Sequence, residues 1–114
     1  PALHVPAVPA NVLHAHYKCY VYVRPEKLAQ GWNRDRIVAE INALEVPCYQ
    51  GSCSEVYMEK AFDGTGWRPA APLPTAHALG TTSVMFLVHP TLTQAEVDTT
   101  CTAIAQVMQQ ATAA

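Results

Sequence analysis

The sequence predicts a small α/β domain, an α+β two-layer sandwich in which a sheet of about three to four strands has helices packed on one face. Residues 17–24 alternate apolar and polar side chains with a period of two, which indicates a strand. Two later segments, 33–44 and 93–108, carry apolar residues at helical spacing. Between them, SVMFLVHP (83–90) is a continuous apolar run, typical of a central strand covered on both faces.

The residues before the first strand, 1–15, are rich in Pro, Ala and Val and predict an extended lead-in or linker, because prolines remove backbone donors. The domain then covers 16–114, a length that suits one domain. The chain does not begin with Met, so we expect a fragment or a processed chain. The apolar face of the first strand comprises Tyr17, Cys19, Val21 and Val23, and Pro25 ends the strand.

A helix is predicted next, at GWNRDRIVAEINAL. Asn33 is suited to cap it, and Asp35 lies in its first turn, where the helix dipole favours a negative charge. VPCYQ (46–50) then predicts a second strand, and Pro47 within it indicates an edge position because proline cannot donate to a neighbouring strand. The core-facing stripe of the helix is Ile37, Val38, Ile41 and Leu44.

The stretch GSCSEVYMEKAF follows the second strand. Ser52 and Glu55 have the spacing of a capping box, which predicts a short helix from about Glu55 to Phe62. DGTGWRPAAPLP indicates a turn-rich loop. One or two further helical turns are expected at 73–79, ended by Gly80.

The last element is predicted to be a long helix. Thr93 and Glu96 have the capping-box spacing at its start. Apolar residues recur at helical spacing behind them, so one face of this helix is expected to pack on the sheet; they are Val97, Cys101, Ile104 and Met108.

The composition is that of a globular domain, with 50% hydrophobic and 14% charged residues. The formal net charge is −2 and the basic residues form no run, so a nucleic-acid partner is not expected. No apolar segment approaches the ~20 residues that a membrane span needs, and the first residues do not resemble a signal peptide. We therefore expect a cytoplasmic protein without a membrane partner.

Cys53 is a candidate nucleophile, because the dipole and free N–H groups of the predicted helix 55–62 would stabilise a thiolate there. A nucleophile also needs a base, and no histidine is close to Cys53 in the sequence. The alternative, which we favour, is a small loop residue beside the capping Ser52. His77 and His89 lack the neighbours of a catalytic triad.

The cysteines do not predict a metal site. Cys48 and Cys53 are separated by four residues, whereas structural zinc sites use tight paired spacings. Cys19 and Cys48 fall on apolar strand positions, which favours buried thiols over ligands. Without an export signal, reduced thiols are the expected state of all four cysteines. The other potential ligands, upstream of Cys48, are His14, His16 and Cys19, and the fourth cysteine is Cys101.

Three segments together carry a resemblance to a known family: HAHYKCYVYVRPE, GWNRDRIVAEINALEVPCYQGSCSEVYMEKAF and LPTAHALGTTSVMFLVHPTLTQAEVDTTCTAIAQVM. In this order they resemble the C-terminal small domain of the DegT/DnrJ/EryC1/StrS aminotransferases, enzymes that use pyridoxal phosphate (PLP) to make amino sugars. The resemblance covers His14 to Met108. Its most specific part is the L-x-HP-x-L-T segment before the final helix.

The resemblance implies that the cofactor chemistry belongs to a large N-terminal domain, which carries the Schiff-base lysine, the aspartate on the pyridine nitrogen and most phosphate contacts. None of the lysines of this chain matches that context, so the chain alone is expected to bind no PLP and to be inactive. The implied partners are the large domain of the same polypeptide, an amino-acid donor such as glutamate, a keto-sugar nucleotide and the second subunit of a homodimer. The lysines are Lys18, Lys27 and Lys60.

The resemblance also implies a substrate-facing loop, because the small domain closes one side of the active-site cleft in this family. Many relatives have a histidine or a basic residue in or just after this loop, where this chain has Ser-Cys-Ser. Small hydroxyls and free N–H groups suit a sugar hydroxyl or a phosphate oxygen. No catalytic, cofactor-binding or metal-binding residue is assigned; the substrate-binding residues are Gln50, Gly51, Ser52, Cys53, Ser54 and Tyr57.

Two other hypotheses remain open at this point. The chain is a free-standing small-molecule-binding or regulatory α/β domain if residue 1 is a genuine start and the fold is independent. It is a thiol enzyme if Cys53 is an activated nucleophile, which alkylation across a range of pH would reveal.

Overall fold

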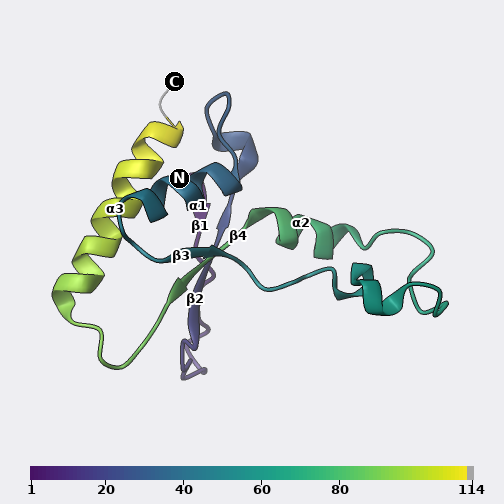
Figure 1. The fold of residues 1–114 in the computed structure, drawn as a ribbon. Helices are drawn as coiled ribbons and strands as arrows, with labels where there is room; N and C mark the ends of the chain where they lie inside the picture. The colour runs from purple at the N-terminus through teal and green to yellow at the C-terminus, as the bar shows by residue number, and fades with distance from the viewer. Residues whose placement is uncertain (113–114) are drawn as a thin grey trace.

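The computed structural model describes residues 1–112 and contains one four-stranded antiparallel sheet with strand order β1-β2-β4-β3 (Figure 1). Helices α1 and α3 share one hydrophobic core with the sheet and lie on one of its faces. The predicted two-layer α/β fold is therefore confirmed. In chain order the elements are β1 Leu3–His4, β2 Lys18–Val23, α1 Arg34–Ala43, β3 Cys48–Gln50, α2 Pro74–Thr82, β4 Ser83–Leu87 and α3 Gln94–Thr112.

The core follows from the period of two in β2. Val21 and Val23 point to the helices and are 5% and 3% exposed. Ile37 and Ile41 of α1 meet them and are each 1% exposed, as the helical stripe predicts. Leu44, the last residue of the predicted stripe, does not face the core: it follows the last helical residue and is 37% exposed. Tyr17 does not join this face, because it precedes the strand and is 81% exposed.

The predicted positions of two strands in the sheet are confirmed. β4 lies between β2 and β3, and Ser83–Phe86 are all buried, as expected for an apolar run covered on both faces. β3 is at the edge of the sheet. Pro47 directly precedes it, and at an edge the missing backbone N–H of proline leaves no neighbouring strand without a hydrogen bond. Cys48 faces the core opposite Phe86.

Local capping starts both long helices as predicted. The side chain of Asn33 accepts a hydrogen bond from the backbone N–H of Arg36 at 2.8 Å. At the other helix, the N–H of Thr93 donates to Glu96 Oε2 at 2.7 Å, and the N–H of Glu96 donates to Thr93 Oγ1 at 3.3 Å. Each cap satisfies backbone donors that the first turn leaves without partners.

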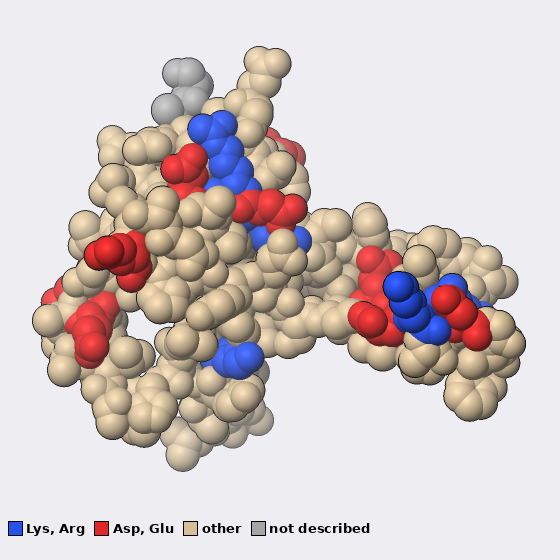
Figure 2. All heavy atoms as spheres, viewed as in Figure 1, with Lys and Arg blue, Asp and Glu red and all other residues tan. Residues whose placement is uncertain are grey.

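The predicted stripe of α3 is wrong over the first half of the helix. Val97 is 40% exposed and Cys101 is also exposed. Only the second half rests on the sheet and on α1, where small residues allow close packing; the buried ones are Ala103, Val107 and Ala111. A groove of about 350 Å³ beside the first half separates it from the strands, and Figure 2 shows the surface hollowed there.

The segment predicted as a lead-in contributes a strand. Leu3 and His4 form β1 and pair with Val23 and Tyr22 of β2. Ala2 is 5% exposed, and its carbonyl accepts from the N–H of Arg24 at 2.8 Å. A strand of two residues is too short to show a period in the sequence.

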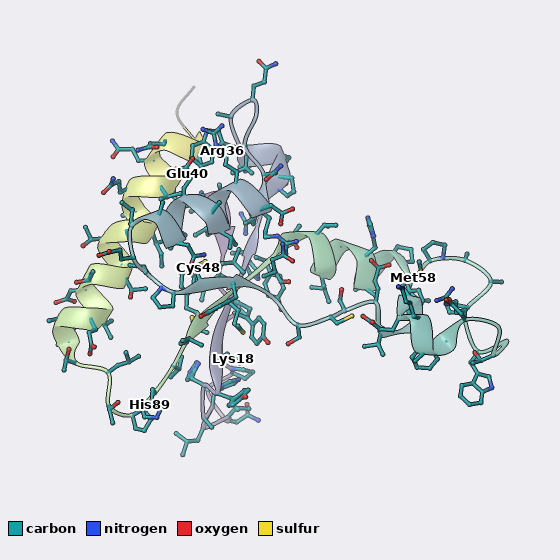
Figure 3. The ribbon with its side chains drawn as sticks, in the orientation of Figure 1. Lys18, Arg36, Glu40, Cys48, Met58 and His89 are labelled. Atoms are coloured by element: carbon teal, nitrogen blue, oxygen red, sulfur yellow. The ribbon has the colours of Figure 1, made fainter. Side chains whose placement is uncertain are left out.

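Residues 51–82, which we call the arm, project from the body of the domain (Figure 1). The radius of gyration is 16.3 Å, against about 13 Å for a compact chain of this length, which agrees with a projecting segment. Large apolar side chains stay exposed on the arm, including Met58, labelled in Figure 3, and Trp67, which is 77% exposed. The arm therefore leaves an apolar surface uncovered by the other described residues.

The predicted helix Glu55–Phe62 is wrong. The structure has two 3₁₀ turns there, Val56–Met58 and Lys60–Phe62. In place of the capping-box contacts, the Ser52 hydroxyl bonds Tyr20 at 2.7 Å, and both carboxylate oxygens of Glu55 contact other side chains.

The helix predicted at 73–79 exists as α2 but continues through Gly80 to Thr82. Gly80 does not end the helix; it allows Ser54 to approach the helix closely. A Cβ at this position would lie 2.5 Å from Ser54 Oγ, so a glycine lets the loop rest on the helix.

Within residues 1–112, no helix combines the length and apolar character needed to cross a bilayer.

Candidate functional site

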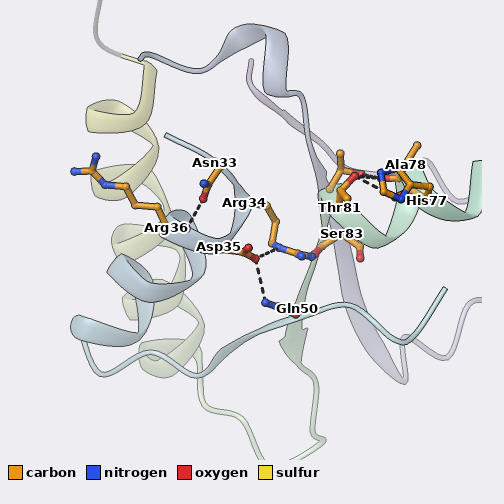
Figure 4. A network of polar contacts seen from close by, with 10 residues as sticks. Asn33, Arg34, Asp35, Arg36, Gln50, His77, Ala78, Thr81 and Ser83 are labelled. Carbon is orange, nitrogen blue, oxygen red and sulfur yellow. Dashed lines mark hydrogen bonds and ion pairs between the residues drawn. The ribbon is translucent and has the colours of Figure 1, made fainter. Parts of the chain in front are cut away.

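The predicted substrate loop leaves the sheet at Gln50, and a polar network holds its start (Figure 4). Gln50 Nε2 donates to Asp35 Oδ1 at 3.0 Å, and Arg34 Nε donates to the same oxygen at 2.6 Å. Arg34 Nη1 also donates to the Ser83 carbonyl at 2.8 Å, and the Arg34 side chain is only 10% exposed. The first turn of α1 therefore connects β4 to the beginning of the loop.

Gly51 and Ser52 hold the loop against β4 and β2. The N–H of Gly51 donates to the Ser83 carbonyl at 3.3 Å. A Cβ on Gly51 would lie 2.1 Å from Ser83 Oγ, so only glycine fits this approach. Ser52 Oγ and the Tyr20 hydroxyl are 2.7 Å apart and form a hydrogen bond between the loop and β2.

Cys53 and Ser54 have partners within the arm. Cys53 Sγ donates to Glu59 Oε1 at 3.4 Å, and Ser54 lies against Gly80 of α2. The polar partner of Cys53 is a carboxylate and not a histidine, so the described contacts do not form the nucleophile–base pair that a thiol enzyme needs. Residues 1–112 also contain no cluster of three His, Cys, Asp or Glu side chains that could hold a metal ion.

Tyr57, the last predicted site residue, is held by hydrogen bonds at its hydroxyl. It donates to Glu55 Oε1 at 2.8 Å and accepts from the N–H of Leu73 at 3.0 Å. The Leu73 N–H acts to lower the pKa of Tyr57, but partial burial and the Glu55 carboxylate outweigh it, so the pKa is raised. The other oxygen of Glu55 lies 3.1 Å from His77 Nδ1.

Arg68 fixes the two 3₁₀ turns below the loop. Its Nε donates to the carbonyl of Tyr57 at 2.8 Å, and its Nη2 donates to the carbonyls of Met58 and Glu59, both at 3.1 Å. Nη2 also pairs with Asp63 Oδ1 at 2.5 Å. Figure 2 shows basic and acidic side chains close together on the arm.

The six predicted site residues thus lie in one continuous strip that runs from the end of β3 into the arm. Intramolecular contacts hold each of them, so the loop has a defined shape without a ligand. Sequence reasoning missed the residues that hold it, because they come from other elements. These residues are Tyr20, Asp35, Glu55, His77 and Ser83. In the sequence, Asp35 and Glu55 stand out only as residues at helix starts and His77 only as an isolated histidine.

The four cysteines are free thiols with very different exposure. Burial raises the pKa of Cys48 to about 11. Burial also raises the pKa of Cys19, and the nearby Cys101 adds to this effect. Cys53 and Cys101 are exposed.

We predict that iodoacetamide at about pH 8 modifies Cys53 and Cys101 first and leaves Cys48 intact until the protein unfolds, because the buried thiol is protonated and out of reach. Mass spectrometry of peptides over time measures the order, and the same reaction in denaturant is the control. Modification of Cys48 at the rate of Cys53 would contradict the buried position of the Cys48 side chain.

The lysines of the chain do not form a cradle for PLP. Lys18 lies in the body (Figure 3), with Nζ 5.4 Å from the centre of the Tyr17 ring. Lys27 and Lys60 are exposed, each within a 3₁₀ turn. Every buried side-chain nitrogen or oxygen among the described residues already has a hydrogen-bond partner. No chemical step of the cofactor is assigned to these residues.

A small antiparallel sheet with helices on one face and a structured arm is the architecture of the small domain of aminotransferases. The chain matches the X-ray structure of the aminotransferase from Psychrobacter cryohalolentis with a TM-score of 0.91 and 53% sequence identity, over 96% of this chain and 29% of that one. The predicted resemblance to aminotransferases is thus confirmed by structure and by sequence.

Two more distant structures share the fold. A DegT DnrJ EryC1 StrS aminotransferase from Brucella abortus matches with a TM-score of 0.73 and 20% identity, over 92% of this chain and 26% of that one. The aminotransferase TlmJ from Streptoalloteichus hindustanus matches with a TM-score of 0.74 and 16% identity, over 94% and 26%. The chain therefore spans less than a third of each of these aminotransferases. No protein-family model and no curated protein matches the chain.

Proposed function

We propose that this chain is the C-terminal small domain of a PLP-dependent aminotransferase that transfers an amino group from an amino acid, such as glutamate, to a keto-sugar nucleotide. The observation that carries the proposal is the 53% identity to an aminotransferase across 96% of this chain and 29% of that one. The coarser conclusion, a part of an aminotransferase, follows directly from this match. In the proposal, PLP is held by the large domain of the same polypeptide, and the whole enzyme is a cytoplasmic homodimer.

The proposed task of this chain is to shape one side of the substrate pocket with residues 50–54 and Tyr57. Two features support this role. The loop is held in one shape by contacts to α1, β2, β4 and α2, and a rigid wall orders a substrate at a lower entropic cost than a mobile one. The arm that continues from it exposes apolar side chains that a larger domain would cover.

A chimeric enzyme tests this function. The chain replaces the corresponding 29% of the Psychrobacter cryohalolentis aminotransferase, whose large domain then supplies the cofactor site. We expect the chimera to bind PLP and to transfer the amino group of glutamate to a keto-sugar nucleotide. A folded chimera that binds PLP but aminates no keto-sugar nucleotide would refute the proposed substrate class.

The role of the loop is tested by adding bulk at an exposed position. In the chimera, Cys53→Phe is expected to raise the KM for the keto-sugar nucleotide about tenfold, a loss of about 1.4 kcal/mol, with the absorbance of bound PLP unchanged. Thr99→Phe, on the exposed surface of α3, is the matched control and should leave KM unchanged. Equal KM values for the two variants would exclude the loop from the pocket.

A further inference from the structure

Glu55 is bound at both of its carboxylate oxygens by residues from the two ends of the arm. Oε1 accepts from the Tyr57 hydroxyl at 2.8 Å, and Oε2 lies 3.1 Å from Nδ1 of His77 on α2. The side chain of Glu55 is 25% exposed and that of His77 is 63% exposed. We call Glu55, Tyr57 and His77 the clasp.

The clasp determines which hydrogen bonds the Tyr57 hydroxyl can make to a ligand. A phenol has one hydrogen to donate, and that of Tyr57 is donated to Glu55. The hydroxyl also accepts from the N–H of Leu73. The direction of the Tyr57 hydroxyl therefore depends on the position of Glu55, and the second hydrogen bond that fixes Glu55 comes from His77.

We propose that His77 is a positioning residue, which holds Glu55 from α2 and through it sets the Tyr57 hydroxyl and the shape of the loop before it. The proposal rests on the proposed function in one respect, namely that this loop faces the substrate. The clasp itself is a property of the arm.

The surroundings of His77 leave Glu55 as its charged partner. α2 carries no other titratable residue. A Cβ on Gly80, three positions after His77, would lie 3.9 Å from Glu55 Oε2, so the carboxylate rests along this face of the helix. The other titratable and charged groups of the arm do not contact His77 but have partners of their own. Tyr57 bonds Glu55, Cys53 bonds Glu59, and Arg68 pairs with Asp63.

The clasp depends on pH through the carboxylate. The hydrogen bond from Tyr57, followed by the contact with His77, lowers the pKa of Glu55 below its ordinary value of 4.5. A carboxyl group whose pKa is lower in the folded state stabilises that state above its ordinary pKa and loses this contribution as the pH falls through the lowered pKa. The clasp is therefore closed at neutral pH and opens in acid.

The test uses NMR on the 114-residue chain, comparing the wild type with His77→Ala, His77→Asn and the control Thr75→Ala on the same helix. Two quantities are measured: the carboxyl titration of Glu55, and the exchange rates of the amides of Met58 and Glu59 in the adjoining 3₁₀ turn. Alanine favours the helix, so His77→Ala keeps α2 intact. Asparagine places an uncharged donor near the position of Nδ1.

We expect His77→Ala to raise the pKa of Glu55 toward its ordinary value and to speed exchange of the two amides roughly 1.5- to 5-fold, the factor for an exposed pair. His77→Asn should restore most of both properties, and Thr75→Ala should change neither. An unmoved Glu55 titration in His77→Ala, no rescue by Asn, or equal effects of Thr75→Ala would each overturn the proposal. Because no cofactor or substrate is present, this result does not depend on amino transfer by the chimera.

Discussion

Replacing Ile41 by Ala is expected to lower the free energy of unfolding by about 2–5 kcal/mol. Ile41 is 1% exposed and lies in the cluster where α1 meets the sheet and α3. Truncation removes buried methyl groups and leaves a cavity that rigid neighbours cannot fill. Denaturant unfolding followed by circular dichroism measures the loss.

Leu44→Ala is the control for this prediction, because it removes a similar side chain at the end of the same helix, where Leu44 is 37% exposed. Its cost should stay below about 1 kcal/mol. Equal losses for the two variants would mean that the α1 stripe does not face the core as described.

Gly51→Ala is expected to cost about 1–3 kcal/mol and to displace the loop, although it adds a single methyl group. The new Cβ would lie 2.1 Å from Oγ and 2.6 Å from Cβ of Ser83, distances that force the two strand ends apart. The same denaturant experiment measures the cost, and the chemical shifts of the loop amides report the displacement.

A second substitution identifies the cause of the Gly51→Ala effect. Ser83→Gly removes both atoms that the new methyl group would meet, so the double variant should recover much of the loss. Additive losses from Gly51→Ala and Ser83→Gly would show that the two residues do not touch and that the loop does not lie against β4.

The sequence predicts those parts of the fold that are determined by residues close to one another in the chain. The alternation in β2 and the cap at Asn33 involve residues within a few positions of one another, and the structure has both. The edge position of β3 follows from a single proline in the same way. Hydrophobic periods and caps act within one element, so one sequence is enough to recognise them.

The first part of the arm, residues 51–62, could not be predicted because its partners are distant in the chain. Ser52 satisfies the pattern of a helix cap, but Tyr20, 32 residues earlier, takes its hydroxyl. Glu55 likewise pairs with His77, 22 residues later. In the same way, the period of α3 cannot show that its first half stands off the sheet, since that depends on the path of the helix.

The loop of the candidate site was found by family resemblance and not by its own chemistry. Gln50 and Tyr57 are ordinary polar residues, and no charge cluster or metal-ligand spacing marks them in the sequence. The role of Gly51 also becomes apparent only when Ser83 is seen beside it.

The most direct test of the central claim, that this domain shapes a pocket whose cofactor lies on another domain, is to incubate the 114-residue chain with PLP, glutamate and a keto-sugar nucleotide. Visible absorbance after removal of free PLP and the amount of amino-sugar product are measured together. The account predicts neither bound cofactor nor product. Retained PLP and amino transfer by the chain alone would contradict it.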